Sequence, residues 1–208
     1  MLTLLWLLPL TSASADRARL LVLGDSLSAG YGIPAEAGWV SLLQKRLDDK
    51  SGAWEVINAS ISGDTTGGGL NRLPAALQRH EPDIVVIELG GNDGLRGLSL
   101  SVMRNNLSQM VHLAREKGAQ VLLLGVHLPA NYGPRYGERF HRVFIEVAMK
   151  TKTPLVEFFL EGVAEDLALM QADGIHPSAA AQPRVLDNVW PKLETLINGH
   201  TETTQASM

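Results

Sequence analysis

Apolar positions along the chain follow two alternating patterns. Continuous apolar runs recur five times, which is typical of parallel strands that are covered on both faces. Amphipathic stretches with helical spacing separate these runs. The runs predict strands at residues 19–23, 54–58, 83–89, 120–126 and 154–158. The amphipathic stretches predict helices at about residues 38–49, 66–80, 101–117, 134–150 and 179–197.

This repeated strand–helix order indicates a parallel sheet with helices on both faces. A barrel of eight such units needs about 250 residues, and this chain has 208. Five units fit a flavodoxin-like, three-layer α/β/α domain with a five-stranded parallel sheet in the order 2-1-3-4-5. The polar, non-periodic C-terminal stretch predicts a disordered tail at residues 199–208.

The composition narrows the class of protein. Hydrophobic residues make up 45% and charged residues 19%, a balance that excludes a wholly disordered or fibrous chain. The net charge is −4, so there is no basic excess to neutralise phosphates, and we expect no nucleic-acid partner. The absence of cysteine excludes a disulfide scaffold, a thiolate zinc site and a cysteine nucleophile.

The N-terminal residues predict a targeting signal. The stretch MLTLLWLLP is apolar but far short of the ~20 residues of a membrane span, so we expect none. It suits the apolar region of a secretory signal, and Ala13-Ser14-Ala15 is a small-x-small cleavage site. We therefore expect a signal peptide at 1–15, a folded domain at 16–198 and a periplasmic or secreted protein. The signal is atypical because no Lys or Arg precedes the apolar run, and an apolar arm packed on the domain stays an alternative.

Ligands of such sheets bind beyond the carboxyl ends of the strands, so the residues that follow each strand are the candidate site residues. The first strand is followed by GDSLSAG, which puts Ser26 at a strand-to-helix turn. The hydroxyl of a serine there is exposed, and its backbone N–H lies near a helix N-terminus. Both favour a nucleophile beside which an oxyanion develops. Asp and Ser are also ordinary helix caps, so a structural role stays open.

The second and third strands are followed by SGDTT and GGNDG. Gly63 in the first block allows a backbone N–H to approach a substrate with no side chain in the way. Asn92 in the second block offers a neutral amide donor, which can stabilise an oxyanion. The alternatives are a helix cap at Asp64 or Thr65 and a plain Gly/Asn turn.

Near the C-terminus the chain reads DGIHP. A carboxylate at Asp173 can accept the Nδ1–H of His176, which fixes the tautomer whose Nε2 is free to act as a base. An Asp/Gly turn with a surface histidine is the alternative. We expect no metal site, because the other histidines show no H-x-x-x-H or comparable spacing.

Together these blocks resemble the SGNH (GDSL) hydrolases. GDSLS, SGDT, GGND and DGIHP match the blocks of that family in order. The longer stretches NASISGDT, ELGGNDGLRG and QADGIHP resemble its bacterial thioesterase I, lysophospholipase and arylesterase group. The likeness covers about residues 19–197.

The resemblance implies a serine esterase without a cofactor. Ser26 would be the nucleophile, His176 the general base and then acid, and Asp173 the residue that orients His176. The oxyanion hole would consist of the backbone N–H groups of Ser26 and Gly63 and the side-chain amide of Asn92. The implied substrates are small molecules: acyl thioesters, lysophospholipids and aryl esters.

Apolar residues of the same loops are candidates for the substrate-binding wall. They are Leu95 and Leu98 after GGND, Leu128 and Pro129 after the fourth strand, and Ile175; simple loop packing is the alternative for each. Two other functions stay open: a carbohydrate O-deacetylase of the same superfamily, and a non-catalytic flavodoxin-like binding module. A monomer is assumed by default.

Overall fold

Five parallel strands form the centre of the molecule. A computed structural model describes residues 17–50 and 52–206, so the expected signal peptide lies outside the described residues and stays a prediction. The strand order is β2-β1-β3-β4-β5, which confirms the predicted topology. The strands are β1 (Ala18–Gly24), β2 (Trp54–Asn58), β3 (Ile84–Glu88), β4 (Gln120–Leu124) and β5 (Leu155–Val156).

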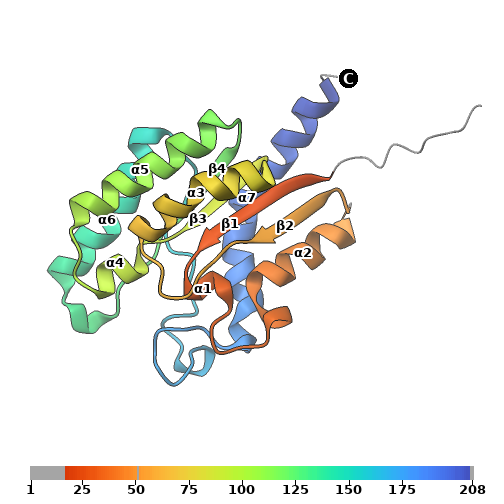
Figure 1. Ribbon diagram of the computed structural model, residues 1–208. Helices are drawn as coiled ribbons and strands as arrows, with labels where there is room; N and C mark the ends of the chain where they lie inside the picture. The colour runs from red at the N-terminus through yellow and green to blue at the C-terminus, as the bar shows by residue number, and fades with distance from the viewer. Residues whose placement is uncertain (1–16, 51, 207–208) are drawn as a thin grey trace, which may run out of the picture.

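Helices cover both faces of this sheet (Figure 1). Helices α3, α5 and α6 pack side by side on one face, while α2 and α7 cover the other. Two short helices, α1 and α4, directly follow β1 and β3 at the carboxyl edge. The helices are α1 (Ser26–Ala29), α2 (Trp39–Lys50), α3 (Thr66–His80), α4 (Gly91–Leu95), α5 (Leu100–Glu116), α6 (Pro134–Thr151) and α7 (Gln182–Ala206), with 3-10 turns η1 (Ala35–Ala37), η2 (Ala130–Tyr132), η3 (Leu167–Leu169) and η4 (Ala179–Ala181).

The core lies on both faces of the sheet because the central strands are apolar at successive positions. Every residue of β3 is buried, as are the last five of β1. Each helix adds one apolar stripe, such as Leu107, Met110 and Val111 on α5. Burying one such side chain contributes about 1.5–3 kcal/mol, so the sheet is a rigid support for the loops at its edge.

The edge strand β5 is shorter than the predicted 154–158. After Val156 the chain turns away, and Glu157 is exposed. Backbone bonds to Gly125 hold this turn, since Gly125 donates to Val156 (2.8 Å) and accepts from Phe159 (3.1 Å). The apolar run therefore continues into a turn rather than a longer strand.

The last helix continues where the sequence predicts a disordered tail at 199–208. The structure extends α7 through Ala206. His200 packs edge-on against Trp54, with ring centroids 5.2 Å apart, and its Nε2 lies 3.8 Å from an Asp83 carboxylate oxygen. These contacts join α7 to the sheet at His200, within the stretch that the sequence predicts as a tail.

Among residues 17–50 and 52–206, no helix has the length and apolar character that crossing a membrane requires.

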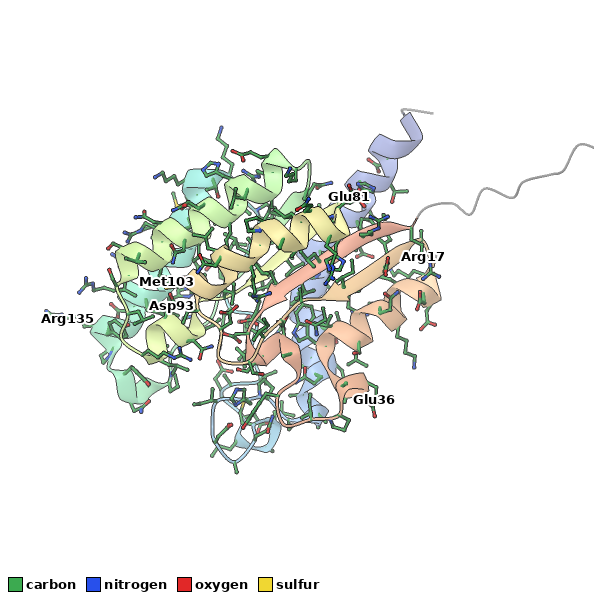
Figure 2. The ribbon with its side chains drawn as sticks, in the orientation of Figure 1. Arg17, Glu36, Glu81, Asp93, Met103 and Arg135 are labelled. Atoms are coloured by element: carbon green, nitrogen blue, oxygen red, sulfur yellow. The ribbon has the colours of Figure 1, made fainter. Side chains whose placement is uncertain are left out.

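The amino ends of the strands lie at the edge where Figure 2 labels Arg17 and Glu81, and Glu36 marks the opposite, loop-bearing edge.

Candidate active site

The loops that carry the candidate residues meet at the carboxyl edge of the sheet. The register pairs Val22 with Asn58 and Gly24 with Glu88, so β1, β2 and β3 end close together. The long connection between β5 and α7 returns to the same edge and lies beside α1 (Figure 1). Segments distant in the sequence thus form one site, as expected for a doubly wound sheet.

Ser26 is the first residue of α1, directly after β1. The Asp25 side chain caps this helix by accepting the N–H of Leu27 at 3.0 Å. Gly30 ends the helix in the left-handed conformation (φ +73°). Within the described residues, the backbone N–H of Ser26 donates to no protein acceptor, so it is available to a ligand.

His176 connects Ser26 with Asp173. Its Nε2 lies 2.8 Å from the Ser26 hydroxyl, and its Nδ1 lies 2.6 Å from Asp173 Oδ2. Asp173 Oδ1 also accepts the backbone N–H groups of Ile175 (2.9 Å) and His176 (3.0 Å). Because a carboxylate only accepts hydrogen bonds, Nδ1 must carry the proton, which leaves Nε2 free to accept the serine proton.

The environment of Asp173 keeps it ionised. Partial burial acts to raise the pKa of Asp173, but hydrogen bonds from the backbone and ring of His176 and from Ile175 outweigh this effect and lower it to about 2. The Tyr31 ring lies 4.6 Å from the His176 ring. Gln171 fixes the loop, since its N–H donates to the His176 carbonyl and its amide to the Tyr31 carbonyl, both at 2.7 Å.

Gly63 and Asn92 line the same cavity as Ser26. Gly63 has φ +80°, a conformation that strongly favours glycine. Its carbonyl accepts a hydrogen bond from Arg96 at 2.7 Å, and its N–H has no protein acceptor within the described residues. Asn92, on α4, donates one amide hydrogen to Asp25 at 3.0 Å. The structure therefore brings together all five residues predicted for the triad and oxyanion hole.

A cavity of about 820 Å³ opens beside Ser26. Four of the predicted substrate-binding residues line it, namely Leu95, Leu128, Pro129 and Ile175. Leu98 does not line the cavity and is exposed. Other lining residues were not predicted for substrate binding, and most are apolar: Val126, Ala130, Phe158, Leu160, Ala164 and Met170.

His127 also lines the cavity, stacked on His141 with ring centroids 3.9 Å apart. Desolvation, and then the neighbouring His141, lower the pKa of His127. A neutral His127 imidazole is therefore part of the cavity wall at neutral pH. Within the described chain, no three His, Asp or Glu side chains gather as metal ligands would.

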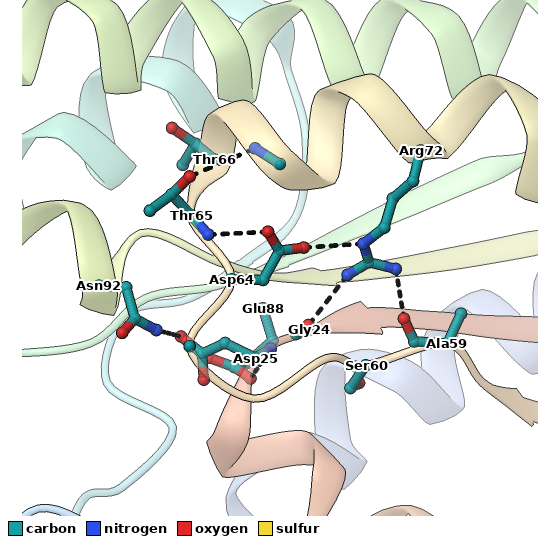
Figure 3. A network of polar contacts seen from close by, with 12 residues as sticks. Gly24, Asp25, Ala59, Ser60, Asp64, Thr65, Thr66, Arg72, Glu88 and Asn92 are labelled. Atoms are coloured by element: carbon teal, nitrogen blue, oxygen red, sulfur yellow. Dashed lines mark hydrogen bonds and ion pairs between the residues drawn. The ribbon is translucent and has the colours of Figure 1, made fainter.

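Sequence reasoning missed Arg72, which fixes the loop that carries Gly63 (Figure 3). From α3, its guanidinium donates to Asp64 (2.7 Å) and to the carbonyls of Gly24 (3.1 Å) and Ala59. Arg72 thus joins the Gly63 loop to the end of β1 that precedes Ser26. The sequence offers one clue to this contact, a cation eight residues after Asp64. That spacing does not predict a contact, because Asp64 lies before the start of α3 and Arg72 lies within it.

We expect Arg72→Met to lower kcat by about 10²-fold, because a displacement of about 1 Å at a reacting group costs that much. It should also lower the free energy of unfolding by about 1–3 kcal/mol, since Asp64 and two carbonyls each lose a hydrogen bond. Ester hydrolysis and denaturant unfolding measure the two effects. Arg46→Met is the matched control, because Arg46 pairs with Asp187 on the surface (2.7 Å). Equal effects of the two substitutions on kcat would contradict the role of Arg72.

The comparison with known proteins identifies the family. The model of the GDSL-like Lipase/Acylhydrolase family matches residues 22–183. The chain belongs to this family. It is 57% identical over 190 residues to Esterase TesA of Pseudomonas aeruginosa, an alignment that covers 91% of this chain and 94% of that protein.

Two further comparisons agree with this assignment. The chain is 45% identical over 197 residues to the thioesterase 1/protease 1/lysophospholipase L1 of Escherichia coli K12, covering 95% of this chain and 93% of that protein. A crystal structure of TesA matches with a TM-score of 0.84 and 60% identity, covering 86% of this chain and 99% of that one. This GDSL-family protein is a serine esterase.

Proposed function

We propose that this esterase hydrolyses carboxylic esters and thioesters through an acyl-enzyme on Ser26. The observation that carries the proposal is the position of His176, which lies within hydrogen-bond distance of both Ser26 and Asp173 at the edge of a largely apolar cavity. A hydroxyl, a base with the correct tautomer and a second group that orients the base are the parts of serine acyl transfer.

In the first step the Ser26 hydroxyl attacks the acyl carbonyl while His176 Nε2 takes its proton. The imidazolium that forms is stabilised by the ionised Asp173. The tetrahedral intermediate collapses when His176 gives this proton to the leaving alcohol or thiol. The acyl group remains on Ser26 as an ester.

In the second step a water molecule attacks the acyl-Ser26 carbonyl while His176 takes a proton from the water. Collapse of the second intermediate returns a proton to Ser26 and releases the carboxylic acid. Both intermediates carry a negative oxygen, which would accept from the N–H groups of Ser26 and Gly63 and from the second amide hydrogen of Asn92. Removing one such donor typically costs about 10²–10³ in kcat.

The cavity wall supports substrates with an apolar acyl group. Leu95, Leu128, Pro129 and Ile175 can contact the acyl chain, and each buried CH₂ contributes about 0.8 kcal/mol. Acyl thioesters and lysophospholipids share an apolar acyl chain and differ in their leaving groups, whereas an aryl ester carries its apolar ring in the leaving group. The relative from Escherichia coli carries the names thioesterase 1 and lysophospholipase L1, which supports the first two classes.

Hydrolysis of p-nitrophenyl esters from acetate to palmitate tests the proposal. We expect kcat/KM to rise with chain length while added CH₂ groups enter the cavity, and to level off when the chain extends beyond it. Ser26→Ala protein is the blank in each assay. A profile that is flat or highest at acetate would contradict the acyl-chain role of the four apolar residues.

Two other functions give different results in the same series. A carbohydrate O-deacetylase would release acetate from acetylated sugars faster than it cleaves long-chain esters. A non-catalytic binding module would turn over neither substrate although folded. The apolar cavity wall favours the acyl esterase over the sugar deacetylase.

We also propose that the protein is exported, on the strength of the apolar run and the Ala13-Ser14-Ala15 site. The N-terminal sequence of the protein recovered from its native host tests this. Export with cleavage predicts a mature chain that begins at Asp16. A chain that retains Met1 and stays in the cytoplasm would contradict it.

A further inference from the structure

Asp25 is a buried carboxyl that the mechanism above does not use. It lies directly before Ser26 and is only 1% exposed. Both of its oxygens accept hydrogen bonds. Oδ1 accepts the backbone N–H of Leu27 at 3.0 Å, and Oδ2 accepts the amide of Asn92 at 3.0 Å (Figure 3). One carboxyl thus joins α1, which carries Ser26, to α4, which carries Asn92.

The chemistry of an amide makes this contact directional. An asparagine side chain has two N–H donors on one side and a carbonyl acceptor on the other. A carboxylate only accepts, so it favours the orientation in which Asn92 turns its Nδ2 toward Asp25. One amide hydrogen is then used by Asp25, and the second is left for an acceptor in the site. In the reversed orientation the amide oxygen of Asn92 would face the carboxylate of Asp25, and the two would repel each other.

The charge of Asp25 fits this role. Burial raises the pKa of Asp25 to about 6, while hydrogen bonds from Leu27 and Asn92 limit the rise. Asp25 is therefore mainly ionised at neutral pH. Beside it, burial and the charge of Asp25 raise the pKa of Glu88 well above its ordinary value. Glu88 Oε2 accepts from the Ser28 hydroxyl (2.7 Å) and the Asp25 backbone N–H (3.3 Å), so Glu88 holds the backbone of Asp25 in place.

We propose that Asp25 is a positioning residue that fixes the orientation of the Asn92 amide and aims its second N–H at the forming oxyanion. This inference rests on the proposed oxyanion role of Asn92. It adds to that role a second function of the same carboxyl. Because Asp25 also caps α1, it fixes the position of Asn92 relative to the backbone N–H of Ser26.

Asp25→Asn is the decisive substitution because it preserves size but leaves only one acceptor oxygen. Asparagine is as good a helix cap as aspartate, so its oxygen can keep the Leu27 bond. Its amide nitrogen then faces Asn92, which must turn its own oxygen toward it and thereby loses the N–H aimed into the site. We expect kcat to fall by about 10²-fold, near the cost of losing one oxyanion donor, with KM unchanged.

A double-mutant cycle separates this role from a merely structural one. Asn92→Ala alone should lower kcat by about 10²–10³-fold. If Asp25 acts through Asn92, adding Asp25→Asn to Asn92→Ala should lower kcat no further. Losses that multiply in the double variant would overturn the proposal, as would a single Asp25→Asn variant with wild-type kcat. Full activity of Asn92→Ala would instead refute the oxyanion role itself, so the two failures are distinguishable.

Asp166→Asn is the matched control, since Asp166 also caps a turn by accepting a backbone N–H, that of Ala168, at 2.9 Å. It should leave kcat unchanged.

A second measurement does not depend on the Asp25 variant folding. In the NMR spectrum of the wild-type protein, the Asn92 amide signals are assigned by their absence from Asn92→Ala. We expect one of the two hydrogens to be shifted downfield and to exchange slowly with water. Two signals at the positions of exposed asparagines would overturn the proposal.

Discussion

Replacing Ser26 with alanine is expected to lower kcat for ester hydrolysis by about 10⁶-fold, the size of the loss when the nucleophile of a serine triad is removed. The hydroxyl lies 2.8 Å from His176 Nε2, and its removal leaves the base without a nucleophile to activate. The change deletes one oxygen at a half-buried position, so the protein should remain folded. Steady-state assays with p-nitrophenyl esters measure the loss, and unfolding curves check the fold.

Two further experiments make this result specific to Ser26. A fluorophosphonate should label the wild-type protein on the peptide that contains Ser26, and should not label Ser26→Ala. Ser41→Ala is the control, because Ser41 is exposed on α2, where its hydroxyl donates to the Ala35 carbonyl (2.7 Å). Ser62 also lines the cavity, so activity that survives in Ser26→Ala together with a label on Ser62 would refute our assignment of the nucleophile.

The sheet could be predicted from the sequence because its central strands are apolar at successive positions. β3 reads IVVIE, and only Glu88 interrupts the apolar pattern. That exception was itself a signal, since a carboxyl within a fully buried strand needs a local partner. The sequence does not show which partner it has. The contact with Asp25 and Ser28 depends on the register that places Gly24 beside Glu88.

The candidate site could be predicted because parallel strands end at one edge, so blocks that follow them meet there. Contacts between side chains and distant backbone atoms could not be predicted from the sequence. Arg72 binds the carbonyls of Ala59 and Gly24. Because every residue has a backbone carbonyl, the residue types do not show which carbonyls a side chain binds. The continuation of α7 beyond residue 198 could not be predicted either, because the contact of His200 with Trp54 joins residues that are far apart in the sequence.

Asp173→Asn is expected to lower kcat by about 10⁴-fold, the loss measured for this change in a serine protease triad. Asparagine keeps one oxygen, which can still accept the backbone N–H groups of Ile175 and His176 and preserve the turn. Its amide nitrogen then faces His176 Nδ1 at the 2.6 Å contact. Because both groups cannot donate, the histidine proton moves to Nε2, and Nε2 can no longer accept the proton of Ser26.

The pH dependence of the deficit is a second check on this explanation. The pKa of Asp173 is about 2 in the folded protein, below its ordinary value. The stability that its ionisation contributes is therefore present above the unfolded pKa and is lost as the pH falls toward 2. At neutral and alkaline pH Asp173 stays ionised and histidine is neutral, so the deficit of Asp173→Asn should be constant there. Asp166→Asn, on the same connection, should retain wild-type kcat. A deficit that disappears at alkaline pH, or one equal to that of Asp166→Asn, would exclude the tautomer as its cause, because the wrong tautomer persists wherever histidine is neutral.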